Sequence, residues 1–419
     1  MLHILPPATR RASRAQPRMN SSLLRNALIL GLLSALGPFA IDMYLPALPA
    51  IGADLHAGTR EVQASLMAFF IAIGVCQLVY GPLADMYGRK RPLYFGLTLF
   101  ALGSIGCSLA PNIESLVVFR FIEGVGACAG MVIPRAIVRD LHTGPEATRL
   151  MSMLMLVFSV SPILAPLGGS IIVSFASWRV IFWAVTLTAV LGIVLMALWL
   201  HETRPAEQRA GSSLGSAMAG YALLLRDRHF LGLTFIGAFG MAGFFAYLAN
   251  SSFVLIEHYG LTPAQYSGFF AANAASFIGV SQFNGRLSER YGLPRVIRIG
   301  VLGALVPALL LFGAYAAGVD SLPLLAVLVF VSFGFLGLVV PTTSVLALDD
   351  HGEIAGTASA LLGTLQMVTG AVVMACIASF VDGSAMPMVR GIAACMLTAF
   401  VLAQLTLKRA PQPPARLTT

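Results

Sequence analysis

Long stretches without Asp, Glu, Lys or Arg follow one another along almost the whole chain of 419 residues. Nearly all of them reach the roughly 20 residues that an α-helix needs to cross ~30 Å of hydrocarbon. Ten such stretches occupy residues 62–84, 92–113, 150–178, 180–201, 229–256, 258–285, 299–319, 321–348, 354–381 and 391–407. Two further segments, 26–49 and 115–138, are as apolar but are interrupted by charged residues. The pattern predicts twelve membrane-spanning helices.

A short polar motif occurs twice, about half the chain length apart. The first copy, Gly-Pro-Leu-Ala-Asp-Met-Tyr-Gly-Arg-Lys-Arg, occupies 81–91, and a weaker copy, Gly-Arg-Leu-Ser-Glu-Arg-Tyr-Gly, occupies 285–292. Both copies follow a long apolar stretch and carry an acid four residues after the first glycine. Such a repeat indicates two similar halves, an arrangement that often places a substrate site at the interface between the repeats.

These halves define the expected fold, an all-α membrane protein with twelve transmembrane helices in two pseudo-symmetric six-helix bundles. The bundles are expected over 25–201 and 229–407, joined by a cytoplasmic linker of small and polar residues over 202–228. The basic residues 1–24 are expected to form a disordered cytoplasmic leader, and 408–419 a cytoplasmic tail.

Composition and charge distribution support this class. The chain is 58% hydrophobic and 11% charged, with a mean hydropathy of +0.85, too little charge to cover a soluble protein of this length. The net charge of +8 does not indicate a nucleic-acid partner, because the 26 basic residues are unevenly placed. Only Arg60, Arg179 and Arg390 fall on the outer side and Arg120 within a span. The excess of basic residues on the other side predicts that both termini are cytoplasmic.

No pattern indicates a cofactor, a metal or a nucleotide. The five cysteines lack C-x-x-C spacing, and the seven histidines contain no H-E-x-x-H pattern. The chain has no G-x-x-x-x-G-K-[ST] motif, so we do not expect ATP as its energy source. A G-x-S-x-G pattern over 211–215 lies between two membrane spans, where the strand and helix of a hydrolase are not expected. We therefore do not expect an enzyme.

The first copy of the repeated motif has the features of a gating loop. Gly81 and Gly88 permit a tight turn, and Asp85 can meet backbone N–H groups or the positive end of a helix. The loop resembles the signature loop of the major facilitator superfamily, in which it locks the cytoplasmic side. The resemblance implies a gate formed by Gly81, Asp85, Gly88, Arg89 and Lys90, with Asp140 as partner. Met86 stands where Arg or Lys is usual, so one charge of the lock is missing. On composition alone, a basic topology anchor is an equal alternative.

The fifth predicted span contains Ser-Pro-Ile-Leu-Ala-Pro-Leu-Gly-Gly over 161–169. Two prolines and two glycines so close together kink a helix and leave a narrow, smooth face. The spacing is similar to the antiporter motif of drug/proton exporters, with Ala165 in place of the usual glycine. Ordinary helix packing is the alternative. The residues of this motif are Pro162, Ala165, Pro166, Gly168 and Gly169.

Three charged residues within spans are candidates for proton coupling: Asp42, Arg120 and Glu123. At ~1.5 Å per helical residue, all three lie roughly 6–10 Å below the outer edge of the hydrocarbon core. A lone charge at this depth is costly, so such residues face the protein interior and pair. We expect Asp42 to accept the proton and Arg120 to keep it ionised, with Glu123 as a second proton site or as an acid that raises the proton affinity of Asp42. A static ion pair between the spans is the alternative.

The motifs around Asp42, around Arg120 and in the fifth span together resemble the Bcr/CflA subfamily of bacterial multidrug exporters, over residues 20–407. Aromatic and amide side chains expected to face a central cavity are candidates for substrate binding, although each could instead face lipid or another helix. They are Tyr44, Phe158, Tyr247, Asn250, Phe253 and Gln366.

The resemblance implies a proton-coupled antiporter that exports small amphipathic drugs or toxic compounds across the bacterial inner membrane by alternating access. We expect a monomer in the lipid bilayer that binds small molecules and protons, with no cofactor other than the proton gradient. The alternatives are a proton-driven exporter of one endogenous metabolite, such as an amino acid or a sugar, a membrane-embedded enzyme, and a non-transporting receptor.

Overall fold

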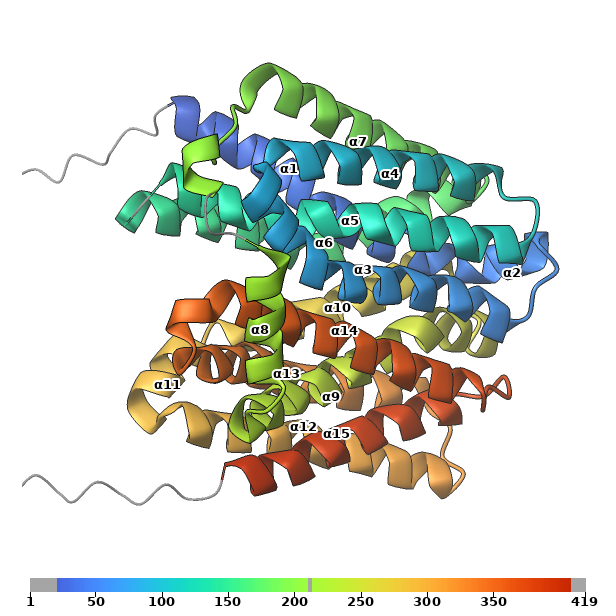
Figure 1. Cartoon of the computed structure of the whole chain (residues 1–419). Coiled ribbons are helices and arrows are strands. Elements are labelled where there is room, and N and C mark those ends of the chain that lie inside the picture. The colour runs from blue at the N-terminus through green and yellow to red at the C-terminus, as the bar shows by residue number, and fades with distance from the viewer. Residues whose placement is uncertain (1–20, 143, 210–212, 408–419) are drawn as a thin grey trace, which may run out of the picture.

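The computed structural model describes residues 21–142, 144–209 and 213–407. Residues 1–20 of the expected leader, the expected tail 408–419 and the first residues of the G-x-S-x-G pattern lie outside the described residues. All the secondary-structure elements of the described part are helices, arranged in two bundles stacked one above the other in Figure 1. The expected fold class, an all-α membrane protein of two pseudo-symmetric six-helix bundles, is confirmed.

The first bundle contains seven helices, of which α2 is a short continuation of the first span. Their bounds are α1 (Ser21–Asp42), α2 (Leu48–Asp54), α3 (Thr59–Tyr87), α4 (Lys90–Leu109), α5 (Ile113–Leu141), α6 (Gly144–Phe175) and α7 (Arg179–Trp199). A single 3₁₀ turn, η1 (Leu45–Ala47), joins α1 to α2.

The second bundle also contains seven helices, of which α11 is a short helix between two spans. Their bounds are α9 (Arg228–Ser252), α10 (Pro263–Ser281), α11 (Asn284–Tyr291), α12 (Leu293–Ala316), α13 (Leu322–Asp349), α14 (Ala355–Ala378) and α15 (Met386–Thr406). The last turns of the α9 span form a π-helix, η3 (Phe253–His258), and a 3₁₀ turn, η4 (Gly352–Ile354), precedes α14.

Eleven helices in the described ranges are long and apolar enough to cross a membrane. The eighth predicted span, 258–285, corresponds to α10, which has 19 residues and is more polar. Its Asn273 side chain is buried and donates a hydrogen bond of 3.0 Å to the Tyr247 hydroxyl group. The α10 helix packs against α6 and α13, so protein rather than lipid surrounds its polar side.

The repeated motif has the same backbone geometry in both halves. Gly88 follows α3 with φ 87° and ψ 168°, and Gly292 follows α11 with φ 79° and ψ 147°. These values are accessible to glycine and strained for other residues. The equivalent turns support the internal repeat that the sequence predicts.

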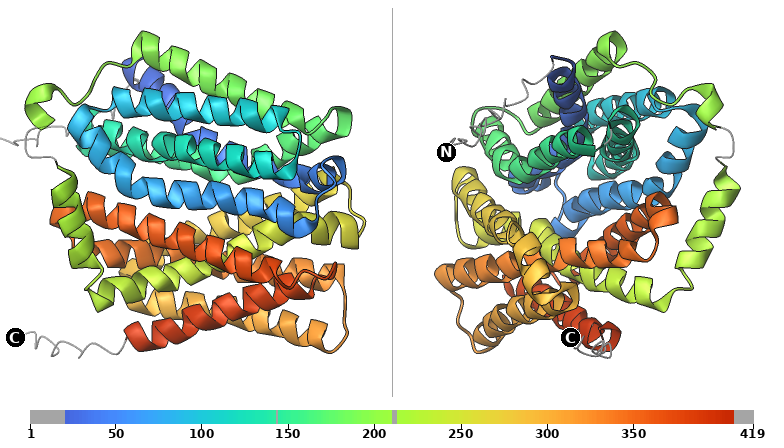
Figure 2. Two further views of the ribbon diagram at one scale, coloured as in Figure 1. Left: turned by 45° about the vertical axis from the view of Figure 1, so that its right-hand side comes forward. Right: turned by 90° about the vertical axis from the view of Figure 1, so that its left-hand side faces the viewer.

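The linker between the bundles contains a helix, α8 (Leu214–Leu224), which runs across the ends of the membrane helices (Figure 1). Its Ser213 side chain caps the first turn by accepting a hydrogen bond from the Ser216 backbone N–H. The start of α1 and the end of α15 lie on the same side of the molecule as α8 (Figure 2). We call this side the termini face, and the opposite side, which carries α2, the far face.

Candidate functional site

A cavity of about 790 Å³ lies between the two bundles. Its wall in the first bundle includes Gln77, Met131 and Arg135, and its facing wall includes Gln366 and Met367 of α14. Residues near the helix ends of the termini face also line it, among them Asp85, Arg139, Tyr221 and Glu353. The cavity therefore reaches from the middle of the molecule to the termini face.

Neutral hydrogen bonds join the two bundles near the far face. The Gln63 side-chain amide of α3 donates to the Ala249 carbonyl at 3.1 Å and to the Asn250 side-chain oxygen at 3.0 Å, both on α9. The Ser252 hydroxyl group donates to the Leu45 carbonyl of η1 at 2.6 Å. These groups are buried, so breaking the contact leaves unsatisfied polar atoms.

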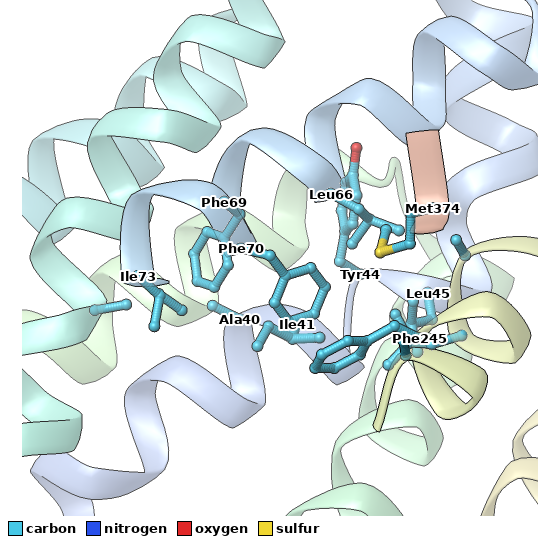
Figure 3. Close-up of a cluster of buried hydrophobic side chains, with 14 of the residues drawn as sticks. Ala40, Ile41, Tyr44, Leu45, Leu66, Phe69, Phe70, Ile73, Phe245 and Met374 are labelled. Carbon is cyan, nitrogen blue, oxygen red and sulfur yellow. The ribbon is translucent and has the colours of Figure 1, made fainter. Parts of the chain in front are cut away.

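An apolar layer lies next to these hydrogen bonds. Figure 3 shows Tyr44, Phe69 and Phe70 with Phe245 and Met374 of the second bundle. The ring centroids of Phe70 and Phe245 are 4.6 Å apart, and all five side chains are buried. The molecule is closed on the far face and open on the termini face.

Arg120 and Glu123 form a fully buried ion pair within the first bundle, since neither side chain has exposed surface. The Arg120 Nη1 atom lies 2.7 Å from the Glu123 Oε2 atom and also donates to the Ala40 carbonyl at 3.3 Å. The guanidinium carbon lies 4.1 Å from the ring centroid of Phe69 and 4.6 Å from that of Tyr44. The Nε and Nη2 atoms of Arg120 have no hydrogen-bond partner among the described residues.

Asp42 is 5% exposed and is the last residue of α1. The sequence predicts that Arg120 pairs with Asp42, but the structure pairs Arg120 with Glu123. Asp42 makes no ion pair or hydrogen bond with another side chain within the described ranges. The physical reason is position, because Glu123 follows Arg120 by one helical turn on α5, whereas α1 ends at Asp42.

The proline and glycine motif of α6 packs against the backbone that follows Asp42. A Cβ atom on Gly169 would lie 2.2 Å from the Met43 carbonyl oxygen, so only glycine permits this approach. The Pro166 carbonyl accepts a hydrogen bond of 2.9 Å from Ser267 of α10 in the other bundle. Ala165 is fully buried. The motif thus contacts both the end of α1 and the second bundle.

The residues expected to form the gate are brought together at the termini face. Arg89 lies between two acids, with its Nη1 atom 2.7 Å from Asp85 Oδ1 and its Nε atom 2.7 Å from Asp140 Oδ2. The Lys90 ammonium group donates to the Leu200 carbonyl at 2.6 Å. Gly88 supplies the positive-φ turn, and a Cβ atom on Gly81 would meet open space.

Glu202 is a member of this cluster that the sequence reasoning missed. Its carboxylate accepts the backbone N–H groups of Arg89 at 2.8 Å and Lys90 at 3.1 Å. Partial burial raises the pKa of Glu202, but these amides and that of Arg204 outweigh burial and hold the pKa below its ordinary value. The position of Glu202 directly after the sixth predicted span was the sequence feature that could have indicated its role.

The candidates for substrate binding occupy different environments. Gln366 lines the cavity, and Phe158 lies under the guanidinium group of Arg135 at 5.1 Å. Tyr44 is hydrogen-bonded to Ser65 at 2.8 Å, and the remaining three are buried towards the far face. These three are Tyr247, Asn250 and Phe253. A binding role for these residues stays a prediction.

Comparison with known proteins identifies the family. Residues 30–374 match the model of the Major Facilitator Superfamily. The chain is 40% identical over 350 residues to "Uncharacterized MFS-type transporter YdgK" of Bacillus subtilis, covering 83% of this chain and 87% of that protein. It is 30% identical over 373 residues to "Bicyclomycin resistance protein homolog" of Haemophilus influenzae, covering 88% and 93%.

The solved structure of a D-xylose-proton symporter has the same fold, with a TM-score of 0.71 and 15% sequence identity, covering 94% of this chain and 99% of that one. The family match over residues 30–374 and the relatives at 40% and 30% identity show that the chain belongs to the major facilitator superfamily and is a membrane transporter. The names of the relatives agree with the resemblance to the Bcr/CflA drug exporters, which is confirmed.

Proposed function

We propose that the chain is a proton-coupled antiporter that exports small amphipathic compounds across the bacterial inner membrane by alternating access. The observation that carries the proposal is the environment of Asp42. This buried carboxyl group ends α1 without a cation partner among the described residues, directly beside the α6 motif. The relatives named for drug resistance support small molecules as cargo.

In the proposed mechanism, this conformation faces the cytoplasm and Asp42 carries a proton. A buried carboxyl group without a cation is most stable in its neutral form. The unpartnered Nε and Nη2 atoms of Arg120 are available to a second carboxylate besides Glu123. When cargo enters the cavity, Asp42 moves to Arg120 and releases its proton to water on the cytoplasmic side, which couples cargo binding to proton release.

The close contact between Gly169 of α6 and the backbone of Met43 couples this movement to the bundles. The α6 helix contacts the end of α1 through Met43 and the second bundle through Ser267, so a rocking of the bundles displaces the backbone beside Asp42. We further propose that the termini face is cytoplasmic, as the basic residues predict. A single chain contains both bundles and the cavity, which supports a monomer as the transporting unit.

The test uses inverted membrane vesicles that contain the chain and are acidified inside by respiration. Addition of a transported compound is expected to release protons and restore the fluorescence of a quenched pH dye. Compounds that bind purified protein but release no protons would contradict antiport. A panel of unrelated amphipathic drugs beside amino acids and sugars distinguishes a multidrug exporter from an exporter of one metabolite.

A further inference from the structure

Arg135 of α5 is a basic residue in the cavity without an acidic partner. It lies six residues before the end of α5, roughly 9 Å along the helix axis from the termini face. Its Nε atom is buried and donates no hydrogen bond within the described part of the chain. Its guanidinium carbon lies 5.1 Å from the ring centroid of Phe158. The Nε–H group in this position loses hydration without a hydrogen bond in return.

Gln366 of α14 lines the same cavity, and its side-chain amide, which lies beside Gly237 of α9, carries a second unused donor. Its Nε2 atom is buried and has no acceptor among the described residues. It is eleven residues into α14, roughly 16 Å from the start of that helix and thus deeper than Arg135. Among the described residues that line the cavity, only these two have a buried side-chain polar atom without a partner, and both atoms are N–H donors.

The acids of the cavity do not neutralise Arg135 in this conformation. Asp85 is engaged by Arg89 at 2.7 Å and by Arg204 at 3.3 Å. Glu353 is exposed at the termini face and makes no ion pair within the described ranges. Arg139, one helical turn beyond Arg135, adds a further positive charge to the same wall. The described lining of the cavity therefore carries positive charge and no acid at the depth of Arg135.

We propose that Arg135 and Phe158 form a subsite for a carboxylate group of an amphipathic cargo. The guanidinium group can bind a carboxylate with two parallel hydrogen bonds, while the Phe158 ring fixes its plane. Gln366 donates to a second acceptor further along the cargo, and Met131 and Met367 contact its apolar body. This inference rests on the proposed transport role of the cavity but not on proton coupling.

The test compares two fluorescent ligands that differ only in their terminal group, dansylglycine with a carboxylate and dansylglycinamide with a neutral amide. Both have an apolar ring system and sulfonyl acceptors, and only dansylglycine is a carboxylate at neutral pH. Fluorescence anisotropy with the purified full-length chain measures the two affinities. We expect wild type to bind dansylglycine about tenfold or more tightly than the amide. One charge-assisted pair of hydrogen bonds provides a difference in affinity of this size.

Arg135→Gln is expected to abolish this preference while its affinity for the amide changes little. Arg135→Lys, which keeps the charge but not the planar fork, is expected to retain part of it. Arg298→Gln is the matched control, because Arg298 also has a buried Nε atom without a partner but does not line the cavity. It is expected to keep the wild-type preference.

Equal affinity of wild type for the two ligands would overturn the subsite, as would an unchanged preference in Arg135→Gln. The vesicle assay separates this outcome from the fate of antiport. If the preference depends on Arg135 but no protons are released, the result supports the subsite and contradicts antiport. If protons are exchanged equally for both ligands, the result supports antiport and contradicts the subsite.

Discussion

The Tyr221 hydroxyl group of the linker helix α8 donates a hydrogen bond of 2.9 Å to the Leu78 carbonyl of α3. Pro82, four residues after Leu78, has no N–H group to complete the usual helical bond to this carbonyl. On its other side, α8 contacts α14, where Gly220 lies against Thr357. The linker helix thus attaches to both bundles beside the open cavity.

Tyr221→Phe is expected to destabilise the protein by about 0.5–1.5 kcal/mol, because it leaves the Leu78 carbonyl unsatisfied. Thermal unfolding of the purified protein measures the change. In a Pro82→Ala background, the restored N–H group can bond Leu78, so the same substitution is expected to cost less. Equal costs in the two backgrounds would show that Tyr221 does not compensate for Pro82.

Gly169→Ala is expected to lower the melting temperature and to slow exchange strongly. The added Cβ atom would lie 2.2 Å from the Met43 carbonyl oxygen, and overpacking of this kind costs about 1–3 kcal/mol. Gly168→Ala is the control, because its Cβ atom would lie 3.6 Å from the Met43 side chain, an ordinary contact. Thermal unfolding and vesicle exchange of both variants test this difference, which equal behaviour would contradict.

Arg89→Gln is expected to slow turnover about tenfold, with little change in the affinity for cargo. A tenfold change corresponds to a rise of ~1.4 kcal/mol in the activation free energy of the conformational change. The residue bridges Asp85 and Asp140 at the termini face, near the opening of the cavity. The neighbouring exposed residue Arg91 makes no ion pair in the described part of the chain. Arg91→Gln is therefore expected to transport normally. If both variants transport equally, the motif serves only as a topology anchor.

Glu202 is expected to make the termini face sensitive to acid. Its pKa is lowered in the folded protein, so its contacts stabilise the fold above the ordinary carboxyl pKa and are lost as the pH falls through the lowered value. Melting temperatures of wild type and Glu202→Gln are expected to differ at about pH 7 and to converge towards about pH 3. A constant difference over this range would contradict the assignment.

Much of the fold follows from the sequence, because the bilayer sets the length of each span. The uncharged stretches gave the membrane helices, and the repeated motif correctly placed equivalent turns at Gly88 and Gly292. The shared depth of Arg120 and Glu123 also indicated that these charges are buried near one another. Each of these inferences depends on local pattern or on position along one helix.

Contacts between helices were harder to predict. Depth alone did not distinguish Asp42 from Glu123 as the partner of Arg120, since that choice depends on the direction of each side chain. The small and polar linker residues did not reveal that Tyr221 reaches α3, because the free carbonyl of Leu78 arises from a proline in another element. Tertiary packing decides such pairings.

Substrate-induced proton release in inverted vesicles that contain Asp42→Asn tests most directly whether Asp42 carries the exchanged proton. We expect a folded, inserted protein that binds cargo but releases no protons, because the only buried carboxyl group without a cation partner in the described residues has been neutralised. Glu123→Gln is expected to keep partial activity, since its amide oxygen can still accept a hydrogen bond from Arg120. Full proton release by Asp42→Asn would contradict the proposed role of Asp42 and leave Glu123 as the proton carrier.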